Sequence, residues 1–232
     1  TRLGLLGWPA QGEELQIARD IEIAKLTGAK LHIQHISTAH GLELVRAGKE
    51  AGVQVTCEVT PHHMFLTEND LDETYNTSLK VNPPLRTDED AAAIRQGVID
   101  GTVDVIVTDH APHTPWEKAR EFELAPFGMI GLETSLALVL TNLVNPGKMS
   151  VSRLVELMSS KPREILGLDP VQVKAGSVAD LTVFDPQIEW TVGEDGYESR
   201  AENSGFAGQK LTGRATDVFV GGKQTLKDGV VC

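Results

Sequence analysis

The sequence has 232 residues, of which 41% are hydrophobic and 23% are charged. This composition is typical of a globular protein with a sizeable core, and it excludes a disordered chain. The acidic residues behind the formal net charge of -12 are scattered among apolar ones, so we interpret the charge as a solvated surface, which argues against a nucleic-acid-binding protein.

The sequence predicts neither a membrane span nor a disulfide framework. The longest apolar stretches, such as residues 135–144, are interrupted by polar residues and fall short of the roughly 20 residues that cross a bilayer. Only two cysteines are present, Cys57 and Cys232, which indicates a reducing compartment and favours a cytoplasmic location. Because Thr1 lies inside an ongoing pattern, we expect the true N-terminus to lie upstream.

Helical and strand-like patterns alternate as far as Leu168. The first helical stretch is followed by Gly28, a favourable C-terminal cap, and then by the alternation typical of a strand. The same rhythm recurs, and it predicts helices over residues 13–27, 39–51, 88–99, 132–143, 152–159 and 163–166, with strands over residues 30–36, 53–59 and 103–107.

A different texture begins after Gly167. Short alternating stretches predict strands over residues 179–184 and 216–220, with turns at Asp185-Pro186, Gly221-Gly222 and Asp228-Gly229. We therefore predict two domains: residues 1–168 form an α/β part, and residues 169–232 form a small β-rich module.

Reactive residues that follow the strands favour an α/β barrel over a doubly wound sheet. No glycine-rich phosphate-binding loop opens any of the predicted helices. About three of the eight strands of a (β/α)8 barrel are present, and a whole barrel takes roughly 250 residues. We therefore expect part of a (β/α)8 barrel followed by an appended β module.

His35 lies at the end of the first predicted strand. Because side chains alternate along a strand, His35 should share a face with Leu31 and Ile33, while His32 points the opposite way. An isolated histidine of this kind is usually a hydrogen-bonded core residue. Its place at the carboxyl end of a strand, which is the catalytic face of a barrel, favours a metal ligand instead.

Another predicted strand ends in Thr108-Asp109-His110-Ala111-Pro112-His113. Asp109 should project on the same face as Val107, where an unpaired charge is unfavourable, so metal coordination and proton transfer explain it better than a loop cap does. His110 should lie on the opposite face and support the ligands by hydrogen bonding, whereas His113 is placed to reach a substrate.

The strand over residues 53–59 leads into Thr60-Pro61-His62-His63. Neighbouring side chains diverge, so we expect at most one of the two histidines to face a site, and structural or supporting roles are favoured over ligation. Cys57 is interpreted as a buried apolar residue, because no cationic residue adjoins it in the sequence.

Taken together, these motifs resemble those of the dihydroorotase family of the long bacterial type, in the amidohydrolase superfamily, and the match covers nearly the whole chain. Hydantoinases and allantoinases share the strand-end histidine and aspartate but not the pairing of Val81-Asn82-Pro83-Pro84-Leu85-Arg86 with Thr108-Asp109-His110-Ala111-Pro112-His113. Other matching motifs are Leu3-Gly4-Leu5, His35-Ile36-Ser37-Thr38, Pro126-Phe127-Gly128 and Gly176-Ser177-Val178-Ala179-Asp180-Leu181.

The resemblance implies the C-terminal part of an amidohydrolase-type (β/α)8 barrel, strands 6 to 8, with part of a small composite β module and one or two Zn2+ ions. It implies that His35 and Asp109 are metal ligands, that Asp109 is also the general acid and base, and that Asn82, His113, Phe127 and Gly128 contact the substrate. Without the resemblance, Asn82 is interpreted as a turn residue and Phe127-Gly128 as a flexible loop.

The activity that the resemblance implies is the reversible, zinc-dependent cyclisation of N-carbamoyl-L-aspartate to L-dihydroorotate in pyrimidine biosynthesis. The family's first-strand His-x-His pair, bridging carboxylate or carboxylated lysine and fifth-strand histidine have no counterpart here, so we expect the isolated chain to be inactive. Two alternatives stay open: a hydantoinase-like or allantoinase-like cyclic amidohydrolase, and a non-catalytic scaffold for aspartate transcarbamoylase. Besides a small-molecule substrate, the expected partners are a second copy of the protein or aspartate transcarbamoylase.

Overall fold

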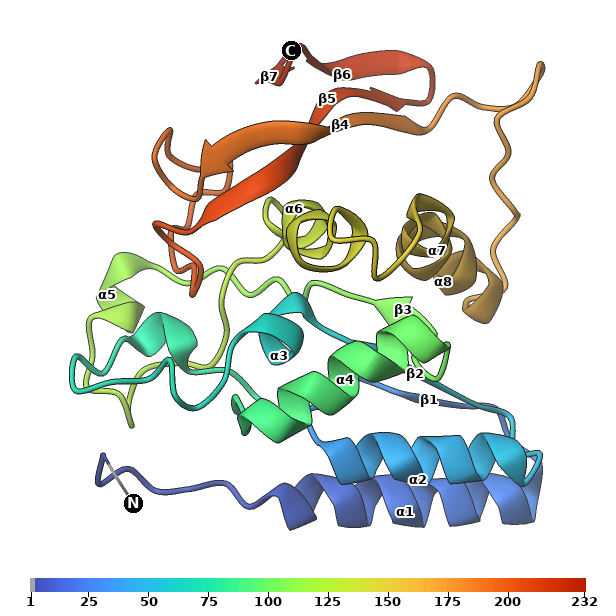
Figure 1. Cartoon of the computed structure of the whole chain (residues 1–232), viewed down its shortest axis with the longest axis vertical. Helices are drawn as coiled ribbons and strands as arrows, with labels where there is room; N and C mark the ends of the chain where they lie inside the picture. The colour runs from blue at the N-terminus through green and yellow to red at the C-terminus, as the bar shows by residue number, and fades with distance from the viewer. Residues whose placement is uncertain (1–2) are drawn as a thin grey trace. The chain divides into compact units, whose positions relative to one another are not determined.

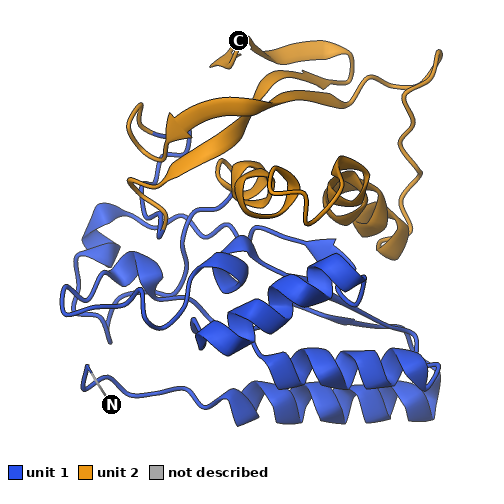
Figure 2. Cartoon of the chain, in the orientation of Figure 1, with its two compact units in different colours: residues 1–132, 197–205 blue, residues 133–196, 206–232 orange. Residues whose placement is uncertain are grey.

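A computed structural model describes residues 3–232, and the chain divides into two compact units (Figure 2). Unit 1 runs as far as Leu132 and includes the later segment Tyr197–Gly205, whereas unit 2 comprises Glu133–Gly196 and Phe206–Cys232. One segment of unit 1 therefore interrupts the sequence of unit 2. The predicted division of the protein at residue 168 stays a prediction.

Unit 1 contains a three-stranded sheet in the order β1-β2-β3, and both strand pairs are parallel. Because parallel strands run in the same direction, their three carboxyl ends lie at one edge of the sheet. Helices α1, α2 and α4 lie side by side (Figure 1). The elements are α1 (Ala10–Thr27), β1 (Leu31–Ile33), α2 (Ala39–Glu50), β2 (Val55–Val59), α3 (Pro61–Phe65), the 3-10 turn η1 (Thr77–Leu79), α4 (Asp88–Asp100), β3 (Val105–Ile106) and α5 (Pro115–Lys118).

Local sequence explains where these elements begin and end. Helix α1 ends at Gly28, which adopts the left-handed conformation, as the sequence predicts. Helix α4 begins with a capping box, in which the side chains of Thr87 and Asp90 each accept a hydrogen bond from the other's backbone amide. Along β2 the burial alternates, so that Val55, Cys57 and Val59 face the core.

Unit 2 contains short helices and a four-stranded antiparallel sheet in the order β4-β5-β6-β7. Two of its helices continue into π-helical turns, which overlap the ends of the predicted helices over residues 132–143 and 152–159 and extend one residue beyond each. The elements are α6 (Ser135–Val139), the π-turn η2 (Leu140–Val144), α7 (Val151–Val155), the π-turn η3 (Glu156–Ser160), α8 (Lys161–Ile165), β4 (Leu181–Thr191), β5 (Lys210–Val220), β6 (Lys223–Lys227) and β7 (Val230–Val231).

The predicted turn at Asp185-Pro186 is wrong. Strand β4 continues through it to Thr191, and the pairing with β5 shifts between Asp185 and Glu189. Such a bulge leaves Pro186 outside the hydrogen-bond ladder, to which a proline cannot donate. The two predicted strands of this region are therefore longer than their sequence patterns indicate.

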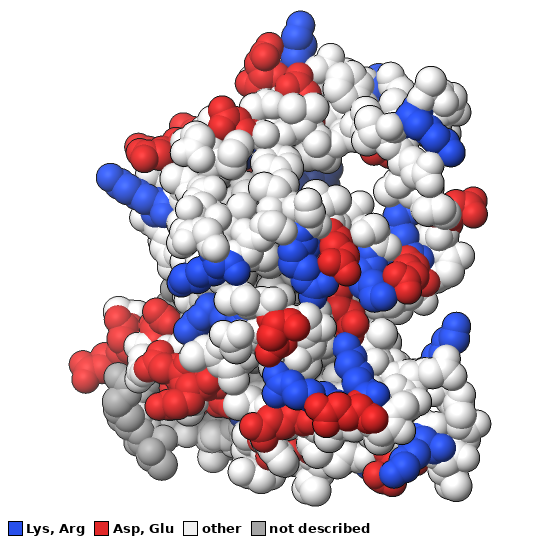
Figure 3. Space-filling model, turned by 45° about the vertical axis from the view of Figure 1, so that its right-hand side comes forward, with Lys and Arg blue, Asp and Glu red and all other residues white. Residues whose placement is uncertain are grey.

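The charged side chains in Figure 3 are interspersed, with acidic and basic groups mixed on the face that it draws. This distribution agrees with the interpretation of the net charge as a solvated surface. Among the described residues, no helix combines the length and the apolar character that crossing a membrane requires.

The carboxylate of Glu13, near the start of α1, forms a hydrogen-bonded centre within unit 1. It accepts hydrogen bonds from the backbone amide of Ser37, at 2.8 Å, and from the Ser37 hydroxyl. It also pairs with the Arg86 guanidinium at 3.4 Å, and the two side chains are only 15% and 10% exposed. Arg86 in turn donates to Ser37 Oγ and to the carbonyl of Trp8. One ion pair therefore joins α1, the segment after β1 and the loop before α4.

We expect Glu13→Gln to lower the free energy of unfolding by about 3 kcal/mol, because it leaves the buried Arg86 charge without its partner. Chemical denaturation of the parent and the variant measures the change. The matched control is Asp20→Asn on the same helix, which removes only the exposed pair with Arg19 and should leave the denaturation midpoint unchanged. Equal midpoints for parent and Glu13→Gln would contradict a stabilising role.

Candidate active site

The carboxyl edge of the parallel sheet gathers three of the motifs identified in the sequence. His35 follows β1, His62 and His63 follow β2, and Asp109 follows β3. The backbone pairing continues just beyond the strands, since Ile36 donates to Glu58 and Val107 donates to Val59. Segments that pair in this way bring the residues that follow them to the same edge of the sheet.

His35 and Asp109 share an unusual backbone conformation. Their φ angles are +34° and +46°, in a region that residues other than glycine seldom adopt. The strands β1 and β3 consequently end at Ile33 and Ile106, earlier than predicted. The alternation that was expected to place His35 on the face of Leu31 and Ile33 therefore does not extend to it. Conformations of this kind concentrate at functional sites, where the surrounding structure maintains them.

His62 and His63 lie on helix α3, not at the end of a strand. Thr60 caps this helix and Pro61 occupies its first turn, where a proline is favoured. The two imidazole rings are buried with centroids 4.4 Å apart, so the expected divergence of their side chains is wrong. Burial, with smaller effects of His63 and His35, lowers the pKa of His62 well below its usual range. The His62 ring is therefore neutral at physiological pH.

Two buried imidazole nitrogens at this edge have no hydrogen-bond partner among the described residues: Nδ1 of His35 and Nε2 of His62. Both ring nitrogens of His63, in contrast, have partners. Its Nδ1 lies 2.8 Å from the Thr60 hydroxyl, and its Nε2 lies 2.8 Å from the carbonyl oxygen of Pro83. His32 is also engaged, with Thr56 and Glu58. Because buried polar atoms in proteins are nearly always paired, the two free nitrogens indicate that a group is to be held there.

Asp109 and His110 have different environments. Within residues 3–232, no hydrogen bond or ion pair engages the partly exposed Asp109 carboxylate. Nδ1 of His110, in contrast, accepts a hydrogen bond from the backbone of Gly131 at 3.1 Å. This agrees with the prediction that His110 supports the site by hydrogen bonding, and it leaves Asp109 available as a ligand or a base.

His35 and Asn82 line one cavity of about 410 Å³, together with Pro83, Glu13 and Arg86. The Asn82 side chain is exposed there. The structure thus brings together a predicted metal ligand and a predicted substrate contact that lie 47 positions apart in the sequence. The predicted convergence of His35 and Asp109 on one site stays a prediction.

A second group of predicted contacts comes together in the segment between Ala111 and Gly131. Nε2 of His113 lies 2.8 Å from the carbonyl oxygen of Phe127, and the next amide, that of Gly128, donates to the carbonyl of Lys80. Gly128 has a φ of +117°, and a Cβ at this position would clash with Ala111. Only glycine therefore fits at Gly128, and the expected flexible loop is instead tightly fastened.

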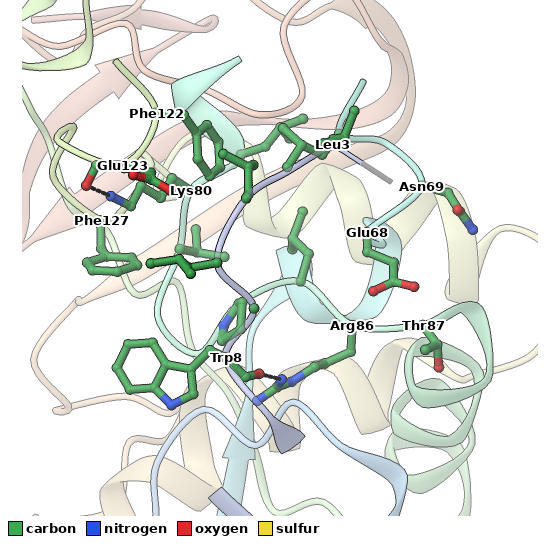
Figure 4. Close-up of a pocket in the computed structure, with 18 of the residues that line it drawn as sticks. Leu3, Trp8, Glu68, Asn69, Lys80, Arg86, Thr87, Phe122, Glu123 and Phe127 are labelled. Atoms are coloured by element: carbon green, nitrogen blue, oxygen red, sulfur yellow. Dashed lines mark hydrogen bonds between the residues drawn. The ribbon is translucent and has the colours of Figure 1, made fainter. Parts of the chain in front are cut away.

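The ring of Phe127 faces a larger cavity of about 800 Å³ (Figure 4). Trp8 meets it edge to face, with ring centroids 6.1 Å apart, and the Lys80 ammonium lies 4.5 Å from its centroid. These two contacts hold the Phe127 ring in place and so restrain the backbone at Phe127-Gly128. Neither His35 nor Asp109 lines this larger cavity.

Two lysines hold the chain immediately before Phe127. Lys80 donates to the carbonyls of Glu123 and Ala125, and Lys118 donates to those of Thr77 and Pro126. Lys118 is buried, and this burial, with a smaller effect of the Lys80 charge, lowers its pKa to about 8. The sequence motifs assigned a role to neither lysine, because each acts on backbone groups that only the fold brings within reach.

Asn203 lies outside the motifs identified in the sequence. Its side chain is 6% exposed, and it contacts both Ala111 and Gly128. Asn203 lies in the segment Tyr197–Gly205, which belongs to unit 1 and separates the two parts of unit 2 in the sequence. It belongs to no strand or helix pattern, so a single sequence offers no local feature that identifies it.

Comparison with known proteins gives a consistent picture. Residues 12–225 match the model of the amidohydrolase family. The dihydroorotase of Pelotomaculum thermopropionicum is 46% identical over 100% of this chain and 54% of its own length. That of Trichlorobacter lovleyi is 48% identical over 96% of this chain and 52% of its own length. The chain thus spans about half the length of these curated relatives.

Solved structures with the same fold include two hydantoinases. An L-hydantoinase (dihydropyrimidinase) from Arthrobacter aurescens matches with a TM-score of 0.89 and 32% identity, over 97% of this chain and 51% of its own. A D-hydantoinase (dihydropyrimidinase) from a Thermus species matches with a TM-score of 0.87 and 28% identity, over 97% of this chain and 50% of its own. Both structures support the predicted α/β class.

We expect Lys118→Met to change how stability depends on pH. Burial lowers the pKa of Lys118 to about 8 from 10.5, so the unfolded chain binds this proton more tightly than the folded protein does. Below pH 8 the folded protein contains an unfavourable buried charge. As the pH rises from about 8 to about 10.5, that penalty disappears and the contribution of Lys118 to stability increases.

Thermal midpoints between about pH 7 and about pH 10 measure this effect. The difference between the parent and Lys118→Met should grow in favour of the parent as pH rises. The exposed Lys25, replaced by Met, serves as the control, and its difference should stay constant. A constant difference for Lys118→Met as well would contradict the lowered pKa.

Proposed function

Because this chain belongs to the amidohydrolase family, we propose that the whole protein is a dihydroorotase, which reversibly cyclises N-carbamoyl-L-aspartate to L-dihydroorotate. The observation that carries this proposal is the identity of 46% and 48% with dihydroorotases over nearly the entire chain. The motifs that distinguish dihydroorotases from hydantoinases, around Asn82 and Asp109, support the same choice.

In this proposal, β1, β2 and β3 correspond to strands 6 to 8 of a (β/α)8 barrel. Their parallel order and the crossover helices α2 and α4 are consistent with consecutive barrel strands. The residues that follow the strands then belong to the catalytic face, as in other barrels of this kind. The antiparallel strands of unit 2 would belong to the small β module.

The residues present fit part of a zinc site. A catalytic zinc takes three protein ligands and leaves an open position. Within the described part of the chain, no three His, Cys, Asp or Glu side chains are gathered closely enough to hold a metal ion. The buried nitrogen of His35 without a partner and the unengaged carboxylate of Asp109 match the donor types that zinc prefers. We therefore assign these two residues as ligands and expect the rest of the whole protein to supply the others.

A bound zinc ion would act as a Lewis acid on the ring carbonyl and on the attacking water. Asp109 would accept a proton as the water attacks the carbonyl carbon of the ring amide. It would then pass the proton to the ring nitrogen as the carbon–nitrogen bond breaks. In the cyclising direction the same carboxylate would take a proton from the ureido nitrogen and return it to the departing water. The carboxylic acid that hydrolysis produces ionises at neutral pH, so hydrolysis also releases one proton to solvent, and cyclisation takes one up.

Substrate recognition would come from the two groups of contacts described above. Asn82, exposed at the cavity that contains His35, would bind the carboxylate of the substrate. His113 and the backbone at Phe127-Gly128 would hold the carboxylate and the amide groups of the ring. A tightly hydrogen-bonded loop suits this role because ring amides need donors and acceptors at fixed positions.

A hydantoinase-like activity is the second candidate, and the likeness to two hydantoinase structures favours it. The substrate distinguishes the two, because only dihydroorotate carries a carboxylate on the ring. On the resemblance alone, we propose that the whole protein forms a homodimer or associates with aspartate transcarbamoylase. The same resemblance leaves a third candidate, a non-catalytic scaffold for aspartate transcarbamoylase.

We expect Asp109→Asn in the full-length protein to lower kcat about 100- to 10,000-fold while substrate binding is largely kept, because an amide cannot accept the proton. Dihydroorotate hydrolysis and N-carbamoyl-L-aspartate cyclisation are both assayed. Asp104→Asn is the control: Asp104 pairs with Lys49 at 2.6 Å, ahead of β3, so its loss should reduce stability and not turnover. Near-normal turnover of Asp109→Asn in both directions would reject the acid and base role.

We expect Asn82→Ala and His113→Ala each to raise the KM for dihydroorotate about tenfold or more, since each removes a hydrogen bond to a charged or polar group of the substrate. Discrimination against plain hydantoin should fall in parallel. The control is Asn76→Ala, an exposed amide that caps the turn η1. If both variants bind dihydroorotate as well as the parent does, the substrate assignment is wrong.

A further inference from the structure

Asn203 lies at a position where three distant segments of unit 1 meet. It belongs to the connection between β4 and β5, and the part Tyr197–Gly205 of this connection is contained in unit 1. Its neighbours Ala201 and Ser204 are also buried. A buried asparagine in a connecting segment is unfavourable unless its amide is fully hydrogen-bonded, so its contacts indicate what it does.

The Asn203 amide joins the two arms of the loop that carries the proposed substrate contacts. Its Oδ1 accepts from the backbone amide of His113 at 3.1 Å. Its Nδ2 donates to the carbonyls of Ala111, at 3.0 Å, and Gly128, at 3.1 Å. Both donor hydrogens and the acceptor oxygen are therefore used. The Asn203 carbonyl also accepts from the backbone of Ile130 at 3.1 Å.

The remaining contacts between the arms show why this amide matters. Ala111 donates to Met129, and the His113 ring meets the carbonyl of Phe127. These contacts join the arms directly, and the Asn203 side chain bridges the backbone of both arms next to His113 and Gly128. Because Gly128 has no room for a side chain against Ala111, a small shift of one arm changes the position of the other.

We propose that Asn203 is a positioning residue for substrate recognition, which fixes the His113 ring and the backbone at Gly128 relative to each other. This inference rests on the proposed function, in which those two groups hold the ring of dihydroorotate. Asn203 would act through them and would not touch the substrate or the metal. Its loss should consequently affect KM and leave the ligands His35 and Asp109 unchanged.

The test uses the full-length protein and compares Asn203→Ala with the parent. KM for dihydroorotate should rise about 10- to 100-fold, as expected when binding groups are displaced by up to about one ångström. The variant should keep a kcat within about threefold of the parent value, and its zinc content should be unchanged. The control is Asn145→Ala, which removes an amide that donates to Pro186 and Thr212 in unit 2 and should leave KM unchanged.

A double variant separates positioning from a general loss of stability. Because Asn203 would act through the His113 ring and the backbone at Gly128, Asn203→Ala combined with His113→Ala should raise KM by clearly less than the product of the two single increases. A purely structural role would make the two increases multiply. Multiplied effects, or an unchanged KM in Asn203→Ala, would overturn the proposal.

Amide hydrogen exchange tests the geometry without any assay of activity. The His113 amide should lose protection in Asn203→Ala and keep it in Asn203→Asp, because aspartate retains the acceptor oxygen. If the parent fails to turn over dihydroorotate but these exchange results hold, the proposed function is wrong and the positioning role stands. If the His113 amide is equally protected in all three proteins, the positioning role is wrong, whatever the substrate.

Discussion

The buried carboxylate of Glu13 is the constraint on which the geometry of the candidate site depends. It is the only side chain of α1 that reaches both Ser37 and Arg86 through the hydrogen bonds of the described residues. Ser37 follows His35 by two positions, and Arg86 follows Asn82 by four. The ion pair therefore sets the separation between a proposed metal ligand and a proposed substrate contact. Its partial burial makes the pair stronger than a surface contact and also makes a missing partner more harmful.

The carboxyl edge of the sheet contains features that stability alone does not explain. His35 and Asp109 adopt backbone conformations of positive φ, and two buried imidazole nitrogens lack partners. Each of these features makes folding less favourable, by about 1–3 kcal/mol. Their concentration after neighbouring strands is what a metal-binding edge requires, since the bound ion would compensate them. These unsatisfied groups are the observations on which the proposed metal centre rests.

Much of the fold could be predicted from the sequence because its causes are local. The helix over residues 39–51 and the strand over residues 53–59 lie within two residues of α2 and β2, since periodicity and capping act over a single turn or a few residues. Helix α3 was missed, although Thr60 and Pro61 are typical of a helix start, because His62 and His63 were interpreted as the end of the preceding strand. The positive φ of His35 could not be predicted, since histidine has no strong preference for it.

The candidate site was predicted less completely than the fold, for a physical reason. His113 and Gly128 lie in recognisable motifs, but the groups that hold them come from elsewhere in the chain. Asn203 lies 90 positions after His113, and Lys80 lies 48 positions before Gly128. Contacts over such separations depend on the completed fold, and a single sequence contains no periodic pattern that indicates them.

The return of Tyr197–Gly205 to unit 1 has a consequence for how the protein is made. During synthesis on the ribosome, the loop between Ala111 and Gly131 leaves the exit tunnel long before Asn203 does. Unit 1 can pair its strands early, but the loop obtains its last hydrogen bonds only when β4 has been translated and the segment after it has emerged. On the proposed function, recognition of the ring would therefore have to wait for a segment that is made long after the loop itself.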